Sequence, residues 1–380
     1  MEPGEARTAQ RPGFRVLVCD DQPDVREALR LLLKGQGWQT ATADSPQALL
    51  EQARSEAFDL ILLDLNYTRD TTSGAEGMDL LAALESQGNQ APVMVMTAWS
   101  SFELAVEAMR RGACDFIQKP WDNQKLVAAI EKQAESERRR KSELEIAANV
   151  QQKLFPSKLR PLNTLDYSAQ CVAARAVGGD YYDFLDTGDD NMVFVLADVC
   201  GKGVPAALLM ANLQAWFRSQ PAASLEEPVP LLESVNRHFF ASTEPDRFAT
   251  LFYGLYNDRI RRLRYVNCAH SEPLLLRVSG ALERLEPTAT VVGAFSRWHA
   301  VEASVEIRPG DMLTLYSDGV TEAMGAGNEE FGDDRLIATL RANRPEAASE
   351  TVRAVIGAVA DFSRGSRSDD ETVMVLRGKA

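Results

Sequence analysis

The sequence predicts two folded domains of different class joined by a helix. In residues 14–135, short apolar runs alternate with longer helical patterns, which is typical of an α/β doubly wound domain with a parallel sheet. Residues 165–378 contain many predicted strands and two helical stretches that are grouped separately, which favours an antiparallel α+β domain and is compatible with a two-sheet β-sandwich. Between them, residues 123–159 are dense in Glu, Lys, Arg, Ala and Gln. A chain of 380 residues is long enough for two such cores and a connector.

The composition argues against a nucleic-acid-binding function. The net charge is −14 at pH 7, and the only dense basic run is residues 138–141, whereas phosphate contacts need clustered Lys and Arg. The five cysteines are odd in number and widely spaced, which fits neither a disulfide framework nor a CxxC zinc site. They are Cys19, Cys114, Cys171, Cys200 and Cys268. We interpret them as free thiols in a reducing cytoplasm.

The sequence also lacks the signals of a membrane protein. No run reaches the roughly 18 apolar residues that a membrane helix needs, and no N-terminal apolar segment has the length of a signal peptide. We therefore expect a soluble, cytoplasmic protein without a membrane partner.

Polar residues follow four predicted strands of the first domain, at the point where each strand ends. Asp20 and Asp21 follow RVLVC, and Asp64 follows DLILL. Thr97 follows PVMVM, and Lys119 follows DFIQ. The carboxyl ends of parallel strands are where sites collect, and three carboxylates beside one lysine would be costly without a hard cation among them. The pattern predicts a Mg²⁺ pocket with Asp64 in its middle.

This ordered set resembles the receiver domains of response regulators. The matching residues are DD, the D of LLDL, the T of MTA and the K of IQKP, and the resemblance covers residues 14 to 135. It implies that Asp64 accepts a phosphoryl group from a cognate histidine kinase. It also implies that Asp20 and Asp21 hold Mg²⁺ together with the backbone carbonyl of Asn66.

The same resemblance assigns the residues around the phosphoryl group. Thr97 and Lys119 would bind its oxygens, Phe116 would be the aromatic residue whose rotamer reports the state, and Lys119–Pro120 would be a cis peptide. A plain core aromatic is the alternative for Phe116. The loop NYTRDTTSGAEG after Asp64 is longer than the usual form and lacks its Met-Pro, so the kinetics of the family are not carried over.

The connector is predicted to be one helix over residues 123–159, because Pro156 is its first strong helix breaker. A 4-3 spacing aligns residues that are apolar at both ends and polar in the middle, which predicts a weak coiled-coil homodimer. These are Val127, Ile130, Ala134, Glu137, Lys141, Leu144, Ala148, Gln151 and Phe155. A solvated spacer helix is the alternative.

Aspartates of the second domain stand where predicted strands meet polar or Gly-rich turns. Asp180 lies in VGGDYYDF, Asp198 ends VFVLAD, Asp318 ends LTLYSD, and Asp369 and Asp370 open DDETVMVL. The GKG after the second of these is no P-loop, because the earlier glycine and the following Ser or Thr are missing. Aspartates with few histidines or thiols favour Mg²⁺ or Mn²⁺. Two such ions sharing one carboxylate could hydrolyse a phosphoester, and Asp198 is the predicted bridging ligand.

Residues 165–378 resemble the bacterial metal-dependent protein phosphatases of the SpoIIE and RsbU-like group. The matching motifs are VGGDYYDF, LADVCGKGVPAALLM, FATLFYGLY, LYSDGVTEA and DDETVMV, and EIAANVQQKLFP resembles the segment that precedes many such domains. The resemblance implies a two-sheet β-sandwich flanked by helices that holds two Mn²⁺ or Mg²⁺ ions. It further implies a substrate that carries phosphoserine or phosphothreonine, typically a small anti-anti-sigma (STAS) protein.

By the same resemblance, each metal has its own ligands. Asp198 bridges both ions, and the carbonyl of Val199 adds a ligand. Asp180 completes the shell of one metal, and Asp318 and Asp369 complete that of the other.

Three residues have two open interpretations. Asp370 is the alternative to Asp369 as a metal ligand. Lys202 could attract the substrate phosphate or be an exposed turn lysine. His270 lies in NCAH, where many members have NAGH, and could be a general acid or a core residue.

These patterns together predict a two-component output protein. Phosphorylation of Asp64 would alter the 123–159 helix and so regulate a phosphoserine/phosphothreonine phosphatase in a partner-switching pathway. One alternative is a signalling adaptor that binds its partner without turnover, and another is hydrolysis of a nucleotide phosphate at the same metals. Whether phosphorylation activates or inhibits is left open.

Overall fold

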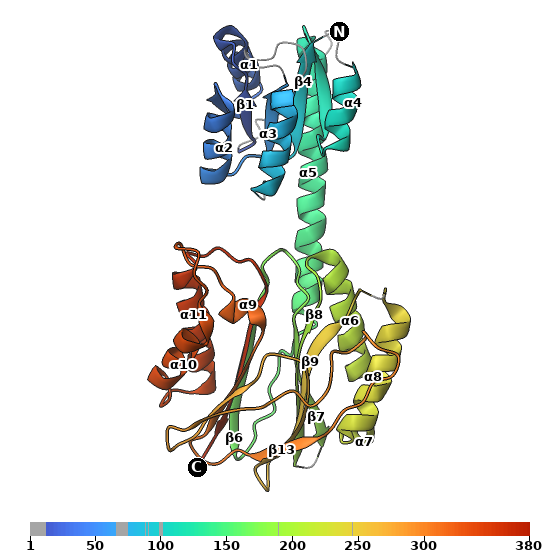
Figure 1. The fold of residues 1–380 in the computed structure, drawn as a ribbon, viewed down its shortest axis with the longest axis vertical. Helices are drawn as coiled ribbons and strands as arrows, with labels where there is room; N and C mark the ends of the chain where they lie inside the picture. The colour runs from blue at the N-terminus through green and yellow to red at the C-terminus, as the bar shows by residue number, and fades with distance from the viewer. Residues whose placement is uncertain are drawn as a thin grey trace, which may run out of the picture. The chain divides into compact units, whose positions relative to one another are not determined.

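The computed structural model describes residues 13–65, 75–87, 89, 91–98, 102–188, 190–244 and 246–380 (Figure 1). The chain divides into two compact units, Met1–Glu143 and Leu144–Ala380. Each unit has its own sheets and its own buried core.

The first unit contains a parallel five-stranded sheet in the order β2-β1-β3-β4-β5. Its strands are β1 (Arg15–Cys19), β2 (Gln39–Ala43), β3 (Leu60–Asp64), β4 (Val93–Ala98) and β5 (Asp115–Lys119). Its helices are α1 (Pro23–Gly35), α2 (Pro46–Ser55), α3 (Ala75–Ser86), α4 (Phe102–Arg110) and the first part of α5 (Asn123–Gln152). The crossover of strand order at β1 is that of a doubly wound sheet, which confirms the predicted fold class.

Both faces of this sheet are buried. Alternate residues of β1 point to opposite faces, so that Leu17 packs in the core beneath α2 and α3, whereas Val16 and Val18 pack in the core beneath α1 and α5. A strand covered on both faces reads as a continuous apolar run, and that is why RVLVC and LILL lack polar alternation.

Helix α5 is 30 residues long and ends earlier than predicted. The side chain of Asp122 caps its start by accepting the backbone N–H groups of Gln124 and Lys125. The helix ends at Gln152 rather than at residue 159, because Pro156 disfavours helical backbone in the residue before it. Phe155 instead packs against the core of the second unit and stacks on Tyr182, with ring centroids 4.9 Å apart.

Residues at both ends of the predicted coiled-coil seam are buried within the two units. Ile130 and Ala134 are buried in the first unit's core, and Val127 packs against it. Gln151 is buried in the second unit, where Phe155 packs as well. The aligned residues at the two ends therefore pack within the units from which they come. The coiled-coil homodimer stays a prediction.

The second unit contains two antiparallel five-stranded sheets, in the orders β13-β10-β9-β8-β7 and β12-β11-β14-β15-β6. The strands of the first sheet are β7 (Tyr181–Gly188), β8 (Asn191–Val199), β9 (Ala249–Asn257), β10 (Arg262–Cys268) and β13 (Ala303–Glu306). Those of the second are β6 (Leu165–Val172), β11 (Leu274–Leu276), β12 (Leu282–Arg284), β14 (Met312–Tyr316) and β15 (Glu371–Gly378). The predicted two-sheet α+β domain is thereby confirmed.

Helices cover the outer faces of both sheets (Figure 1). On the first sheet lie α6 (Val204–Arg218), α7 (Ala222–Leu225) and α8 (Pro228–Ser242), and on the second lie α9 (Asp318–Thr321), α10 (Gly332–Ala342) and α11 (Ala348–Phe362). One core lies between the sheets, with Phe194 and Phe252 from one sheet and Leu313 and Met374 from the other. The described part thus has more helices than the two stretches that the sequence predicted.

The remaining global predictions concern membranes and cysteines. None of the described helices is long and apolar enough to span a bilayer. All five cysteines lie within the described residues and none forms a disulfide, as predicted.

Candidate active site

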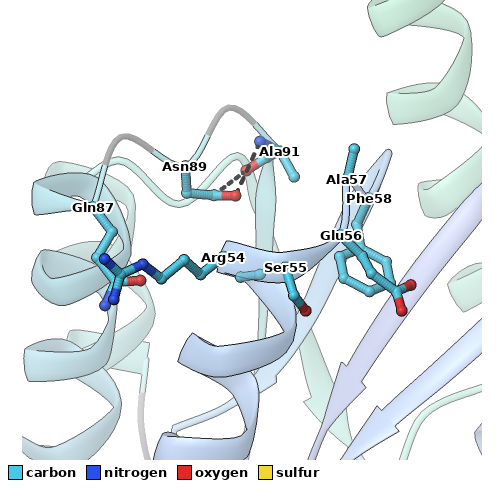
Figure 2. A pocket seen from close by; sticks show the side chains of 9 residues that line it. Arg54, Ser55, Glu56, Ala57, Phe58, Gln87, Asn89 and Ala91 are labelled. Carbon is cyan, nitrogen blue, oxygen red and sulfur yellow. Dashed lines mark hydrogen bonds between the residues drawn. The ribbon is translucent and has the colours of Figure 1, made fainter. Parts of the chain in front are cut away.

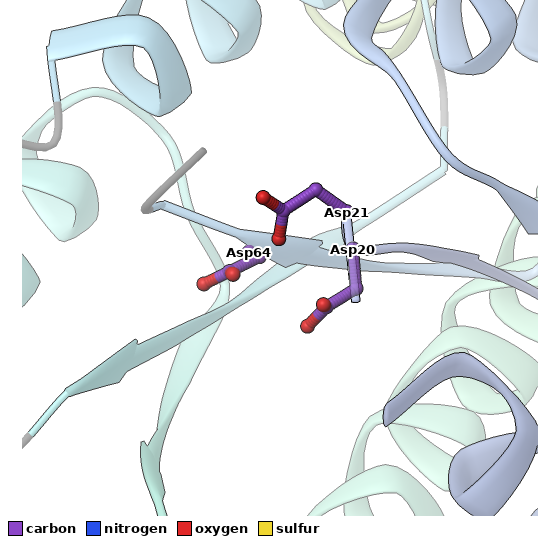
Figure 3. A group of neighbouring side chains, drawn as sticks. All are labelled: Asp20, Asp21 and Asp64. Carbon is purple, nitrogen blue, oxygen red and sulfur yellow. The ribbon is translucent and has the colours of Figure 1, made fainter. Parts of the chain in front are cut away.

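Three carboxylates meet at the carboxyl end of the sheet in the first unit. Asp20 and Asp21 follow β1, and Asp64 is the last residue of β3 (Figure 3). One carboxylate oxygen from each lies within 4.8 Å of the others. Asp20 and Asp64 are buried and Asp21 is half-buried. Buried carboxylate oxygens at such separations suit a hard cation such as Mg²⁺.

Lys119 neutralises part of this negative charge. Its Nζ lies 2.7 Å from Asp20 Oδ2 and 2.8 Å from Asp64 Oδ2. Burial acts to lower the pKa of Lys119, but the two carboxylates outweigh it and raise the pKa above its usual value. The structure therefore brings Lys119 to the carboxylate group, as the strand-end pattern predicted.

Thr97 stands one strand away from Asp64. In the register of β3 and β4, Asp64 pairs with Met96, so Thr97 follows directly after that pair. Thr97 is 3% exposed, and its Oγ1 has no hydrogen-bond partner in the described part of the chain. A buried hydroxyl without a partner is unfavourable unless a ligand oxygen completes it.

The other predicted residues of the first unit have different outcomes. Phe116 is 37% exposed, so the alternative that it is a core aromatic is wrong. The peptide Lys119–Pro120 is cis, as predicted. The predicted carbonyl ligand Asn66 and most of the long loop after Asp64 lie outside the described residues.

In the second unit, the predicted metal-binding aspartates come from both sheets. Asp180 precedes β7, and Asp198 is the penultimate residue of β8 in the first sheet. Asp318 begins α9 after β14, and Asp369 lies two residues before β15 in the second sheet. Residues from two sheets converge because these strand ends lie at the same edge of the sandwich.

The electrostatics of Asp198 report this convergence. Burial raises its pKa, and repulsion from Asp318, Asp369 and Asp370 raises it further, to about 7. Burial and the nearby Asp198 and Asp370 likewise raise the pKa of Asp180 well above its usual range. The pKa of Asp318 is raised by burial and by Asp369. The cluster thus holds more negative charge than the protein alone compensates, which fits divalent cations with oxygen ligands.

This cluster is more open than the one in the first unit. Among the described residues, only Asp20, Asp21 and Asp64 have three ligand oxygens mutually within 4.8 Å.

Lys202 of the GKG turn forms an ion pair with Asp369, with 2.6 Å between Nζ and Oδ2, and donates a hydrogen bond to the Ser368 carbonyl at 2.6 Å. Lys202 is therefore more than an unengaged turn lysine, because it supplies positive charge at the edge of the cluster.

Asp370 differs from its neighbour Asp369 in what it contacts. Its Oδ1 accepts the N–H of Ala174 at 2.8 Å, and its Oδ2 accepts the N–H groups of Gly179 at 2.7 Å and Asp180 at 3.3 Å. Oδ2 thus holds the backbone turn that carries Asp180, and Oδ1 holds the segment before that turn. The Oδ2 of Asp180 itself accepts a 2.5 Å hydrogen bond from the Thr372 hydroxyl.

The glycines before Asp180 are required by close packing. A Cβ on Gly178 would lie 2.1 Å from the Asp370 carboxylate, and one on Gly179 would lie 2.7 Å from the carbonyl oxygen of Val199. The VGGD turn therefore lies directly against the carbonyl that the resemblance assigns to a metal.

His270 is part of the core. It is 3% exposed, its Nδ1 lies 2.8 Å from the Thr250 hydroxyl, and burial lowers its pKa to about 4. A neutral, buried imidazole is poorly suited to act as a general acid near neutral pH, so the structure favours the core interpretation.

Sequence reasoning missed two residues near the second site. Arg247 lies beside the GKG turn: its Nη1 would be 2.6 Å from a Cβ on Gly201, and it donates to the Cys200 carbonyl at 3.4 Å. Gln151 of α5 bonds to Gly178. Neither has a local sequence signal, because each contact joins residues far apart in the chain.

A concave region of the first unit carries no comparable chemistry. Residues 53–58 contribute its walls together with Gln87, Asn89 and Ala91, and Asn89 exchanges two hydrogen bonds with Ala91 (Figure 2). The described lining residues contain one carboxylate, Glu56, which pairs with Arg15. This region therefore lacks the grouped ligands of the two carboxylate sites.

Comparison with known proteins identifies the family. Residues 188–379, just over half of the chain, match the family described as stage II sporulation protein E (SpoIIE). The chain belongs to the SpoIIE family. The match includes Asp198, Asp318 and Asp369, whereas Asp180 precedes it. Residues 16–131 match the response regulator receiver domain.

Individual relatives agree with this division. The phosphoserine phosphatase RsbU of Bacillus subtilis is 31% identical over 240 residues, which cover 63% of this chain and 71% of RsbU. The transcriptional regulatory protein ZraR of Escherichia coli is 38% identical over 117 residues, which cover 31% of this chain and 25% of ZraR. The solved SiaA-PP2C domain of Pseudomonas aeruginosa has the same fold, with a TM-score of 0.55 at 18% identity over 64% of this chain and 98% of that domain.

This SpoIIE-family chain is therefore a metal-dependent protein-serine/threonine phosphatase that also carries a receiver domain. Membership in an enzyme family speaks against the non-catalytic adaptor that the sequence left open.

Proposed function

We propose that phosphorylation of Asp64 regulates the phosphatase activity of this chain toward a protein that carries phosphoserine or phosphothreonine. The observation that carries the catalytic half is the convergence of carboxylates on Asp198, whose pKa is raised to about 7 by burial and by repulsion from Asp318, Asp369 and Asp370. Uncompensated carboxylates in one place are the protein's part of a site for two divalent ions.

In this proposal Asp198 would serve as a ligand to both of two Mn²⁺ or Mg²⁺ ions. The carbonyl of Val199 and the carboxylate of Asp180 would help to hold one ion, and Asp318 and Asp369 would help to hold the other. When bound, two such ions activate water and stabilise the charge on a transferring phosphoryl group. Asp370 is omitted from the ligands, because its oxygens accept backbone hydrogen bonds.

The chain's own residues orient this site. Thr372 donates to Asp180, and Asp370 holds the turn before it, so Asp180 is fixed before any ion arrives. Lys202 and Arg247 place positive charge beside the GKG turn, where a phosphorylated substrate has to approach. The neutral His270 takes no proton-transfer role in this scheme.

The regulatory half rests on the receiver residues. Asp64 would accept the phosphoryl group from a histidine kinase, with Mg²⁺ held by Asp20 and Asp21 and the phosphoryl oxygens bound by Lys119 and Thr97. The proximity of Lys119 Nζ to Asp64 Oδ2, 2.8 Å, supports this arrangement. Helix α5 is continuous from Asn123 to Gln152 and is the proposed carrier of the signal.

We extend the proposal to the cellular partners. RsbU is named a phosphoserine phosphatase, and the likeness to it supports a phosphorylated STAS-type protein in a partner-switching pathway as the substrate. The protein would act in the cytoplasm as a homodimer associated through α5. Its domains would be the receiver at 14–135, the linker at 123–159 and the phosphatase at 165–378.

The test measures phosphate release from a phosphoserine protein with Mn²⁺, with and without beryllofluoride as a mimic of phosphorylated Asp64. Wild type should release phosphate, Asp198→Asn should lose more than about 100-fold in rate because the bridging ligand is gone, and beryllofluoride should change the rate of wild type but not of Asp64→Asn. Asp334→Asn, which removes an exposed carboxylate, is the matched control. Unchanged activity in Asp198→Asn would disprove the ligand assignment, and an equal beryllofluoride effect in Asp64→Asn would disprove the regulatory half.

A further inference from the structure

Gln151 is a buried polar residue near the end of α5. It is 8% exposed, although its neighbours Val150 and Gln152 are exposed. Buried amide side chains are kept where both of their polar ends find partners. Here both partners belong to one residue, Gly178.

The two hydrogen bonds fix the peptide groups on both sides of Gly178. Gln151 Nε2 donates to the Gly178 carbonyl at 2.7 Å, and Gln151 Oε1 accepts the Gly178 N–H at 3.0 Å. Two antiparallel bonds from one planar amide restrict translation and rotation of that backbone, whereas a single bond would allow it to pivot.

Gly178 begins the turn that ends in Asp180. Asp370 holds the N–H groups of Gly179 and Asp180, so Gln151 and Asp370 together satisfy three consecutive backbone donors. Two adjacent glycines are conformationally free, and the packing against Asp370 and Val199 prevents larger residues there. A turn that has to be Gly-Gly therefore needs restraint from outside.

Docking of the helix does not require a glutamine. Leu154 and Phe155, which directly follow the helix, already pack against the apolar core of this unit. The amide group of Gln151 instead forms both of its hydrogen bonds with Gly178, two residues before the proposed metal ligand Asp180.

We propose that Gln151 is a positioning residue that holds the Gly178–Asp180 turn in the geometry needed for metal binding. The inference rests on the proposed function, since it takes Asp180 as a ligand. It makes the metal affinity of the phosphatase depend on the last turn of α5: displacement of that turn removes both restraints on Gly178 at once.

The test is a calorimetric titration of the metal-free full-length protein with Mn²⁺, together with the Mn²⁺ dependence of phosphate release. Gln151→Met keeps the length and helix propensity of the side chain but removes both hydrogen bonds. Loss of a residue that orients a ligand typically weakens metal binding by about 10–100-fold, and we expect this at one of the two sites. The maximal rate at saturating Mn²⁺ should stay close to that of wild type. Gln152→Met, the same change at the exposed neighbour, should bind Mn²⁺ as wild type does.

Two further variants separate the possible failures. Asp180→Asn should lose the same Mn²⁺ site that Gln151→Met weakens. If Asp180→Asn loses a site while Gln151→Met binds Mn²⁺ with wild-type affinity, the positioning role is wrong and the proposed function stands. If Asp180→Asn binds both ions normally, the proposed ligand set itself is wrong. Gln151→Asn keeps the amide but shortens its reach by one methylene, and should weaken the same site. Should Gln151→Met fail to fold, wild-type affinity in Gln151→Asn overturns the inference.

Discussion

At the scale of single residues, Asp369 and Asp370 show how two adjacent carboxylates acquire different tasks. Asp370 is 8% exposed and accepts three backbone hydrogen bonds around the turn before Asp180. Asp369 pairs with Lys202 at the edge of the carboxylate cluster. The sequence DDET does not distinguish the two aspartates. Their contacts show that Asp370 has a structural role and that Asp369 lies at the cluster.

The close approach of Gly179 to Val199 leads to a first prediction. In Gly179→Ala the new methyl group would meet the Val199 carbonyl oxygen at 2.7 Å, so the turn has to move. We expect Mn²⁺ affinity to fall by about tenfold or more, because both Asp180 and Val199 are displaced. Calorimetric titration with Mn²⁺ measures this.

Gly357→Ala is the control for this substitution. Gly357 lies within α11, where an added methyl group meets no atom within 4 Å, and alanine there should stabilise the unit by about 0.5–1 kcal/mol. Equal Mn²⁺ affinities for the two alanine variants would contradict the packing argument.

The raised pKa of Asp198 leads to a second prediction, on pH. The folded, metal-free protein binds this proton up to a pKa of about 7, whereas an unfolded aspartate loses it near 3.9. The contribution of protonated Asp198 to the free energy of unfolding is therefore fully present below pH 4 and is lost as the pH rises through 7. Mn²⁺ displaces the same proton, so its affinity should increase with pH, by up to about tenfold per unit per displaced proton, and level off above 7.

Titrations with Mn²⁺ at pH 6, 7 and 8 check this expectation. The pKa of Asp180 is raised as well, so it acts in the same direction. An affinity for Mn²⁺ that does not change over this range would mean that the cluster binds no such proton.

At the scale of secondary-structure elements, α5 uses its apolar residues in two ways. Val127, Ile130 and Ala134 pack in the core of the first unit, while Ile146 and Val150 are 61% and 57% exposed. These two residues are four positions apart and therefore lie on one side of the helix. An association through α5 would use this exposed pair rather than the predicted seam.

A third prediction follows for the proposed homodimer. Replacing Ile146 and Val150 together by serine should shift the protein from dimer to monomer, because the exposed apolar surface is removed. Analytical ultracentrifugation over a concentration series measures the shift. The control is the double change of Glu145 and Asn149 to serine, which has the same spacing on exposed polar positions. A wild-type protein that is monomeric at all concentrations would contradict the dimer.

Several helices of the phosphatase unit escaped the sequence analysis for physical reasons. Helix α8 begins PVP, and α11 contains five β-branched residues and Gly357, all of which lower helix propensity. Burial overrides that propensity: Leu231, Leu232 and Val235 of α8 pack on one sheet, and Val352 and Val355 of α11 pack on the other. In contrast, α6 was predicted from its leucine- and alanine-rich sequence.

At the scale of the whole molecule, the two units have separate hydrophobic cores. The cores of the receiver unit are built by residues up to Ala134, and those of the phosphatase unit by residues from Leu154 onward. Each unit also has its own carboxylate cluster. Stability and ligand binding should therefore be coupled within each unit first.

This leads to a fourth prediction, for thermal unfolding. Calorimetry should resolve two unfolding transitions, one for each unit. Mn²⁺ should raise the midpoint temperature of the phosphatase unit, and beryllofluoride with Mg²⁺ should raise that of the receiver unit. A ligand at 100 times its dissociation constant adds about 2.7 kcal/mol to the unit that binds it. Asp198→Asn should abolish the Mn²⁺-dependent shift of the phosphatase transition, and Asp64→Asn the beryllofluoride-dependent shift of the receiver transition. A single transition that responds equally to both ligands would show that the units unfold as one.

The sequence by itself determined the two fold classes, the helix between them and the acidic residues at strand ends, because apolar periodicity and turn composition are local properties. Asp20, Asp64, Asp198 and Asp318 could be named in this way. Tertiary structure decided what depends on distant partners: the contacts of Asp370, the burial that keeps His270 neutral, and the use of the α5 seam inside each unit. Burial and hydrogen bonds between residues that are distant in the sequence leave no periodic pattern in it. The hydrogen bonds that hold the turn before Asp180, from Gln151 and from Asp370, therefore became visible only in the folded structure.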